Sequence, residues 1–228
     1  MGYYRDLHEW LGALEAKGYL HRISRRIDKD TEMHPLARLQ FRGLPERERK
    51  GWLFEDVVDV RGRRYDMPVA LAVMAPSRSV YALGMGVDSP EEIPAKWAAA
   101  QTHPIPPRIV SSALCQEMVY QGAALDNAGG LGMLPVPIST PGFDAAPYLT
   151  ATLCVTRDPD TGIQNMGTYR GALKATDRLG VRMSSRIGGA GGYLHWKKHN
   201  QRGEPMPCAI VIGCAPVVMF TGGMKLAV

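Results

Sequence analysis

The first hundred residues alternate between helical and strand-like hydrophobic patterns. Apolar side chains recur at helical spacing over residues 5–17, and Gly18 follows as a natural stop. Alternation of polar and apolar side chains over residues 19–27 predicts a strand. The same reasoning predicts a helix over 31–41, strands over 52–60 and 69–74 around a turn at 61–62, and a helix from Ser89 to about Thr102. These elements indicate an N-terminal α/β domain.

A proline-rich segment, Pro104-Ile105-Pro106-Pro107, interrupts this pattern. Its prolines cannot continue a helix or a central strand, so we place a domain boundary there, between residues 1–107 and 108–228; a rigid loop within one domain is the alternative. Beyond it, short β segments predict a barrel-like sheet domain with a buried strand over 206–212 and one helix over 193–201. We therefore expect a mixed α+β fold. The apolar, strand-like segment 224–228 at the end of the chain indicates a domain that is cut short.

Residues 155–170 predict a β-hairpin. Its turn, residues 158–162, reads Asp-Pro-Asp-Thr-Gly, in which Pro presets φ, Asp bonds its own backbone and Gly accepts a positive φ. The return strand, residues 163–171, carries Asn165, Tyr169 and Arg170. In an extended strand Asn165 and Arg170 lie about 17 Å apart on opposite faces, unless a bulge at Gly167 brings them to one side. Such a pair suits the two ends of a long ligand; the alternative is a scaffold hairpin with a turn-stabilising Asn and a surface Arg.

Composition excludes several classes of protein. The 228 residues are 45% hydrophobic and 21% charged, which is typical of a globular protein of one or two domains. The net charge of +5 includes basic clusters at 61–64 and 197–202 that suit solvated surface or an anionic ligand, without a nucleic-acid-binding signature. We expect no membrane-spanning segment and no signal peptide. Four cysteines in apolar contexts are expected to be buried and reduced, as in a cytoplasmic protein: Cys115, Cys154, Cys208 and Cys214.

Six residues of the return strand, Asn165-Met166-Gly167-Thr168-Tyr169-Arg170, resemble the cofactor-binding signature of the UbiD-type reversible decarboxylases. The resemblance extends to segments 147–150, 182–189 and 209–216. It implies that the second domain is a split-β-barrel-like flavin-binding domain. It also implies a carboxy-lyase that releases CO₂ from, or reversibly carboxylates, an aromatic or α,β-unsaturated carboxylic acid. The implied cofactors are prenylated FMN, a divalent ion (Mn²⁺ or Mg²⁺) and, as an option, K⁺.

The resemblance assigns roles to individual residues. Asn165 would ligate the divalent ion that bridges to the flavin phosphate, and Arg170 would be the catalytic residue, near the reactive ring and the substrate carboxylate. The implied partners are the carboxylic acid substrate, a flavin prenyltransferase that supplies the cofactor, and further copies of the full-length chain in a homo-oligomer. The implied flavin contacts are Thr168, Tyr169, Arg170, Arg182, Met183, Ser184, Ile187 and Gly188.

Two departures from the family pattern stand out. Arg186 occupies the position where several members carry a metal-ligating histidine; Arg offers only donors, so it cannot ligate a metal and could instead contact the phosphate directly. His195 is an alternative ligand, although a packing or capping role is favoured, and its neighbour His199 shares that helix face without a carboxylate beside it. The family's metal-binding glutamate and its catalytic acids have no match in this sequence.

Because proton delivery needs such an acid, we expect this chain alone to bind flavin weakly or not at all and to show no turnover. A non-catalytic flavin-binding or assembly subunit of a multi-chain enzyme is the main alternative. A third interpretation is an ordinary split-barrel flavin oxidoreductase, for which the sequence has no nicotinamide-binding fingerprint.

Overall fold

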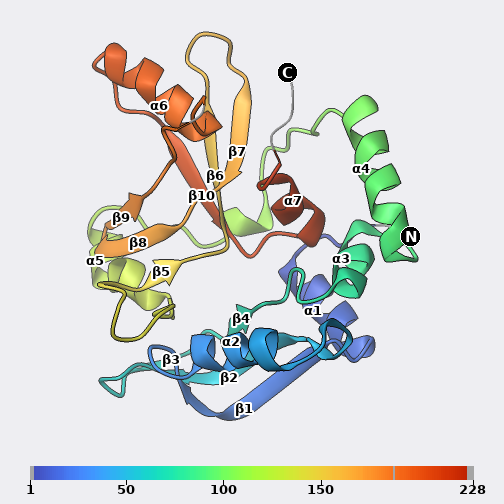
Figure 1. Ribbon diagram of the computed structural model, residues 1–228. Helices are drawn as coiled ribbons and strands as arrows, with labels where there is room; N and C mark the ends of the chain where they lie inside the picture. The colour runs from blue at the N-terminus through green and yellow to red at the C-terminus, as the bar shows by residue number, and fades with distance from the viewer. Residues whose placement is uncertain (1–2, 187, 225–228) are drawn as a thin grey trace.

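The computed structural model describes residues 3–186 and 188–224, whose arrangement is shown in Figure 1. The N-terminal part begins with helix α1 (Leu7–Ala16), strand β1 (Leu20–Asp28), helix α2 (Met33–Gly43), the short helix η1 (Glu46–Glu48) and strand β2 (Gly51–Val58). β1 and β2 are parallel, because α2 carries the chain across between them. The short strands β3 (Arg64–Tyr65) and β4 (Val69–Leu71) pair antiparallel with β2 and complete a four-stranded sheet.

Two hydrophobic clusters stabilise the N-terminal part. In the first, Trp10 and Leu14 of α1 are fully buried and pack with Val73 and Val80. Trp10 satisfies its indole N–H by donating to the backbone carbonyl of Val73 at 3.0 Å. The second cluster joins both main strands to α2 and consists of Ile27, Met33, Phe54, Val57 and Tyr65. The predicted helices and strands of this region are therefore confirmed, with ends that move by a few residues.

Helix caps define the next segment, where the structure adds a helix that was not expected to the one predicted from Ser89. Ser77 caps helix α3 (Arg78–Met85) by accepting a hydrogen bond from Val80 N–H at 3.3 Å, and Gly86 ends this helix with a φ of +68°. Ser89 N–H donates to the Glu92 carboxylate at 3.1 Å at the start of η2 (Pro90–Glu92) and α4 (Ile93–Thr102). The prolines of residues 104–107 then lie in an exposed stretch without helix or strand. Three short helices follow: η3 (Leu114–Gln116), α5 (Ala123–Asn127) and η4 (Gly130–Met133).

Two three-stranded antiparallel sheets form the remaining part. One has the order β10 (Cys208–Ile212), β6 (Thr152–Arg157), β7 (Gln164–Thr168), and the other has the order β5 (Tyr148–Leu149), β8 (Gly171–Ala175), β9 (Arg178–Val181). Helix α6 (Gly191–Gln201) packs on β6 and β7, and helix α7 (Pro216–Thr221) contacts β7 from the other side (Figure 1). The fold is thus mixed α/β, as expected, but across the described residues its sheets stay separate and do not close into a barrel.

Several details of this second part differ from the expectations. The return strand of the hairpin ends at Thr168 and does not continue to residue 171, and the pairing from Arg157↔Gln164 to Leu153↔Thr168 is regular, without a bulge at Gly167. Strand β10 is mostly exposed, whereas a buried strand was expected. Residues 216–221 form a helix that was not expected, and Pro216 stands at its first position, where a missing N–H costs nothing. The predicted strand-like end at 224–228 lies largely outside the described residues.

The cysteines also differ from expectation. Cys154 is buried and Cys214 is half-buried. Cys115 is exposed because it lies in the short, exposed helix η3, and Cys208 is exposed because it lies on the edge strand β10. None of the four forms a disulfide. Across the part of the chain that the structure describes, no helix is both long enough and apolar enough to cross a membrane.

Candidate functional site

The chain passes from one sheet to the other at Tyr169 and Arg170. Strand β7 ends at Thr168, whose backbone N–H donates to the carbonyl of Gly222, just after α7, at 2.9 Å. After two intervening residues β8 begins at Gly171 in the second sheet and pairs with β5 and β9. The carbonyl of Arg170 accepts a hydrogen bond from Arg182 N–H at 3.4 Å. The predicted ligand-binding residues Tyr169 and Arg170 therefore lie at the junction of the two sheets, where the chain leaves β7 and enters β8.

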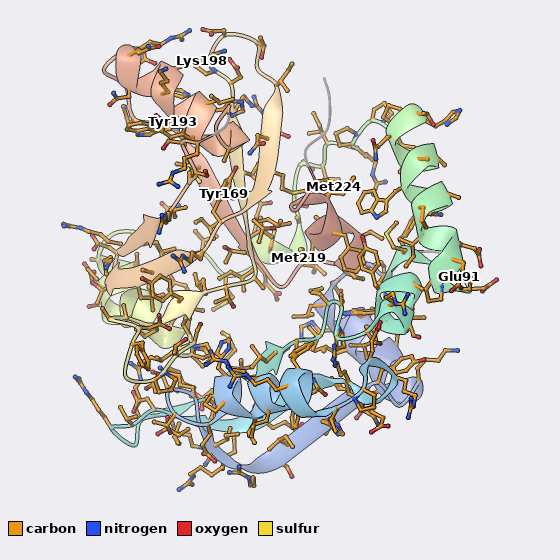
Figure 2. All side chains as sticks on the ribbon, viewed as in Figure 1. Glu91, Tyr169, Tyr193, Lys198, Met219 and Met224 are labelled. Atoms are coloured by element: carbon orange, nitrogen blue, oxygen red, sulfur yellow. The ribbon has the colours of Figure 1, made fainter. Side chains whose placement is uncertain are left out.

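Tyr169 folds back over the strand that precedes it. A Cβ placed on Gly167 would lie 2.5 Å from the Tyr169 ring, so only glycine leaves room for the ring there. The Tyr169 hydroxyl accepts a hydrogen bond from the backbone N–H of Gly192 at 3.2 Å, and the Thr152 hydroxyl donates to the Tyr169 carbonyl at 2.7 Å. Figure 2 shows Tyr169 below the end of α6 that carries Tyr193, with Lys198 further along the same helix. Tyr169 thus joins the strand to the first turn of α6.

A cavity of about 630 Å³ opens beside this junction. Three of its lining residues carry guanidinium groups, Arg170, Arg182 and Arg186, and all three residues are exposed. No carboxylate of the described residues lies within 4.0 Å of these three groups, and Arg170 lies over the Tyr148 ring, 5.6 Å from its centroid. Unpaired arginines around one cavity favour an anionic ligand, because the planar guanidinium matches phosphate and carboxylate oxygens. The full lining is Thr168, Tyr169, Arg170, Arg182, Met183, Ser184, Ser185, Arg186 and Ala190.

Six of the eight predicted flavin contacts line this cavity: Thr168, Tyr169, Arg170, Arg182, Met183 and Ser184. Gly188 is exposed, has a φ of +76° and is not among the lining residues, and Ile187 lies outside the described residues. Ser185, Arg186 and Ala190 line the cavity but were not predicted as flavin contacts. Their signal was present in the sequence, because they continue the same loop, and for Arg186 a direct contact to the phosphate was already the alternative to metal ligation.

Asn165 lies three residues before Thr168, on the face of β7 that α6 covers. Its side chain is half-buried and its Nδ2 atom is buried without a hydrogen-bond partner among the described residues. A Cβ on Gly191 would overlap with the Asn165 amide oxygen, so the first residue of α6 leaves space for this side chain. Asn165 is not among the residues that line the cavity. An amide without a partner can turn its oxygen toward a ligand, which suits a hard cation.

The same surroundings do not make a complete metal site. Arg186 has no acceptor atom, and the described residues contain no group of three or more His, Cys, Asp or Glu side chains placed to hold an ion. Asn165 therefore offers one ligand only. An anion, in contrast, meets three arginines and two serines around one cavity. The residues fit the phosphate and ring of a flavin nucleotide, and they do not by themselves fit Mn²⁺, Mg²⁺ or K⁺.

The two helical histidines are engaged in packing. His195 is buried, and its Nδ1 lies 2.9 Å from the Thr156 hydroxyl, while its Nε2 lies 3.9 Å from the Asp158 carboxylate. Burial lowers the pKa of His195 below its usual value, with the neighbouring Asp158 acting in the opposite direction. Nδ1 of His199 lies 3.8 Å from the Glu204 carboxylate, so a carboxylate does lie beside each histidine, contrary to the expectation from the sequence. The geometry of His195 matches the packing role that the sequence favoured.

An ionic cluster fastens the hairpin turn to the other end of α6. Lys198 Nζ lies 2.6 Å from the Asp158 carboxylate and 2.9 Å from that of Asp160, and Arg202 also pairs with Asp160. The Lys198 ammonium, followed by the backbone N–H of Asp160, lowers the pKa of Asp158 to about 2. The ion pairs of the hairpin turn therefore hold α6 in place, and α6 covers Asn165.

Two family domains match most of this chain. Residues 108–228 match the 3-octaprenyl-4-hydroxybenzoate carboxy-lyase Rift-related domain, and residues 11–98 match the 3-octaprenyl-4-hydroxybenzoate carboxy-lyase N-terminal domain. Among solved structures, the UbiD-class enzyme HmfF from Pelotomaculum thermopropionicum in complex with FMN is 32% identical, with a TM-score of 0.80 over 98% of this chain and 46% of HmfF. An evolved dimeric form of HmfF in complex with prFMN is 29% identical, with a TM-score of 0.76 over 99% of this chain and 48% of that one.

A more distant relative shares the fold. Vanillic acid decarboxylase from Sedimentibacter hydroxybenzoicus, in its closed form, is 24% identical, with a TM-score of 0.81 over 98% of this chain and 46% of that one. The chain thus spans less than half the length of these solved relatives. Since the Rift-related domain alone matches more than half of the 228 residues, this chain belongs to the UbiD family.

Proposed function

We propose that this chain supplies the flavin-binding site of a UbiD-type carboxy-lyase that acts on an aromatic or α,β-unsaturated carboxylic acid. The observation that carries the proposal is the cavity at the junction of the two sheets, which Arg170, Arg182 and Arg186 surround without a carboxylate partner among the described residues. Relatives solved with FMN and with prFMN support the identity of the ligand. Prenylated FMN, when bound, would supply the electron sink for the charge that CO₂ leaves behind.

The residues of this chain would bind and orient the two reactants. Arg182 and Arg186 would hold the phosphate, with Ser184 as a hydroxyl donor, and Arg170 would orient the substrate carboxylate through its planar fork. The Tyr169 ring would form the cavity wall between the phosphate and the substrate carboxylate. The ring packs against Gly167, and its hydroxyl accepts a hydrogen bond from the Gly192 N–H. Ile187 and Gly188 stay predicted contacts of the same loop. Mn²⁺ or Mg²⁺ at Asn165, and K⁺, are expectations from the family that need ligands beyond the described residues.

The cavity lacks one catalytic component. None of its lining residues is an Asp, Glu or His, so the cavity lacks the acidic side chain that the family pattern uses to deliver a proton to the decarboxylated carbon. This observation favours a second candidate function, a flavin-binding or assembly subunit of a multi-chain enzyme, in which this chain binds and another chain completes the reaction. Under either function we place the domain boundary between residues 1–107 and 108–228. A cytoplasmic location, a flavin prenyltransferase as cofactor supplier and homo-oligomerisation of the full-length protein belong to the same proposal.

A binding titration tests the proposal directly. The intrinsic fluorescence of the flavin is followed as the 228-residue chain is added to FMN and, separately, to riboflavin. Because Arg182 and Arg186 would face the phosphate, we expect weak binding of FMN that is still about tenfold tighter than that of riboflavin. Equal affinities for the two flavins would contradict phosphate recognition at this cavity.

A pair of variants places the binding in the cavity. Arg182→Gln is expected to weaken FMN binding by about tenfold, since it removes one charge-assisted contact. Arg178→Gln is the matched control: Arg178 lies four residues earlier, is highly exposed, pairs with Asp177 and does not line the cavity. Adding Mn²⁺ to both series measures whether a cation contributes. Steady CO₂ release from the purified chain supplied with prenylated FMN and Mn²⁺ would overturn the inference that an acid is missing.

A further inference from the structure

Two thiols face each other on neighbouring strands of the sheet below α6. Cys154 of β6 and Cys208 of β10 have their sulfur atoms 3.4 Å apart. Cys154 pairs in register with Ile210, and Cys208 pairs with Thr156, so the two cysteines are diagonal neighbours on one face of the antiparallel pair. Diagonal neighbours are usually further apart, and a sulfur–sulfur distance this short requires both side chains to turn toward each other.

The two thiols differ in access. Cys208 lies on the exposed edge strand, while Cys154 is only 1% exposed. Burial, followed by the contact with Cys208, raises the pKa of Cys154 to about 12. An oxidant in solution therefore meets Cys208 first, and Cys154 reacts through the sulfur beside it.

We propose that Cys154 and Cys208 form a reversible disulfide across β6 and β10 when the protein meets a low-molecular-weight disulfide such as oxidised glutathione. The sulfur atoms need to approach by about 1.4 Å from their 3.4 Å separation to reach bonding distance. The Cys208 thiolate attacks one sulfur of glutathione disulfide, breaks its S–S bond and releases one glutathione, which takes up a proton. Cys154 loses its proton and its sulfur attacks the Cys208 sulfur; the bond between Cys208 and glutathione breaks, and the second glutathione leaves as a thiolate and takes up a proton. The cysteine pair is oxidised by two electrons and glutathione disulfide is reduced to two thiols.

The location gives this bond a structural consequence. Cys154 lies opposite Gly167 and Cys208 lies opposite Thr156, which contacts His195 of α6. The bond would join residues that are 54 positions apart in the sequence and would tie the edge strand to the strand that supports Asn165 and Tyr169. It is distinct from the proposed flavin site, because neither cysteine lines the cavity.

Peptide mapping of the 228-residue chain tests the proposal. The reduced, folded chain is incubated with oxidised glutathione, its remaining thiols are alkylated after unfolding, and the peptides are weighed. We expect a Cys154–Cys208 linked peptide, and about tenfold less glutathione retained on Cys208 than on the exposed Cys115, which has no thiol neighbour among the described residues. Equal glutathione retention on Cys208 and Cys115, with Cys154 fully alkylated, would overturn it.

Two variants separate proximity from simple exposure. Cys208→Ser changes an exposed side chain and should leave the buried Cys154 as a free thiol under the same treatment, since its sulfur partner is gone. Cys154→Ser should let Cys208 accumulate a stable glutathione adduct, and circular dichroism checks that the buried substitution leaves the fold intact. As a second measure, urea unfolding of the oxidised wild-type chain should occur at a higher midpoint than that of the reduced chain, because the cross-link restricts the unfolded state. Oxidation of Cys154 in Cys208→Ser would contradict the proposed order of attack.

Discussion

The hydroxyl of Tyr169 and the backbone N–H of Gly192 are joined by a 3.2 Å hydrogen bond that connects the end of β7 to the first turn of α6. The N–H groups of a first helical turn have no partner inside the helix, and this one finds its partner in a side chain from the hairpin. The same ring lies against Gly167, and a Cβ on Gly192 would lie 2.8 Å from Met183 Sδ and 3.0 Å from the Tyr169 ring. Tyr169 therefore fixes the distance between the hairpin and the loop that completes the cavity.

Tyr169→Phe tests this bond. The variant keeps the ring and leaves the buried Gly192 N–H without its acceptor, so we expect the free energy of unfolding to fall by about 1 kcal/mol. Tyr193→Phe is the matched control, because Tyr193 lies on the same helix and its hydroxyl makes no hydrogen bond within residues 3–186 and 188–224. Urea denaturation followed by circular dichroism measures both. Equal losses in the two variants would show that the Tyr169 bond contributes nothing specific.

Gly167→Ala tests the space under the ring. The added methyl group would meet the Tyr169 ring at 2.5 Å and displace it, so we expect a loss of about 1–3 kcal/mol in the free energy of unfolding together with weaker FMN binding. Gly12→Ala has the opposite expectation. Gly12 lies inside helix α1 with no atom within 4 Å of the place that its new methyl group would take, and alanine should stabilise the helix by about 0.5–1 kcal/mol. A neutral Gly167→Ala would mean that the ring moves freely.

The sequence predicts local structure well where the cause of that structure is local. The turn at 158–162, the cap at Ser89 and the stop at Gly18 each depend on neighbouring residues, and all lie where the sequence places them. The end of β7 at Thr168 could not be predicted in this way. It is set by a bond to Gly222, more than fifty residues later, and by the start of a second sheet at Gly171. Periodicity within the segment carries no information about either.

The candidate site shows the same division. The motif from Asn165 to Arg170 and the segment that follows it identified six cavity-lining residues through a resemblance, but the role considered for Gly167, a bulge that brings Asn165 and Arg170 to one side, is not what the structure shows. The actual reason for a glycine there is the Tyr169 ring above it, a tertiary contact. Likewise, the exposure of Cys208 follows from the edge position of β10, since an apolar run has the same pattern on an edge strand and on a central one.

Gly191→Ala tests the space around Asn165. A methyl group at position 191 would overlap with the Asn165 amide oxygen, so we expect a loss of about 1–3 kcal/mol in the free energy of unfolding. A double-mutant cycle with Asn165→Ala isolates the contact: in that background the same substitution should cost clearly less, because the obstructing atoms are gone. Additive losses in the cycle, measured by urea denaturation, would place the cost of Gly191→Ala elsewhere in α6.

Lys198→Gln tests the ionic cluster between the hairpin turn and α6. Asp158 has a pKa of about 2, lowered first by Lys198, against an ordinary value of about 3.9 for an aspartate in an unfolded chain. A lowered pKa stabilises the folded state fully above the unfolded value, and this contribution is lost as the pH falls through the folded one. The wild type should therefore be more stable than Lys198→Gln at pH 7, and the difference should shrink between pH 4 and about pH 2.

The carboxyl resonance of Asp158, followed by NMR against pH, checks the cause of this difference. In Lys198→Gln the pKa of Asp158 should rise toward its ordinary value, although the Asp160 N–H bond at 2.8 Å keeps it partly lowered. Lys197→Gln is the matched control, since Lys197 is the adjacent residue of α6, is exposed and makes no ion pair within the described ranges. If both variants moved the Asp158 pKa equally, the net charge of the helix and not the 2.6 Å contact with Lys198 would be responsible.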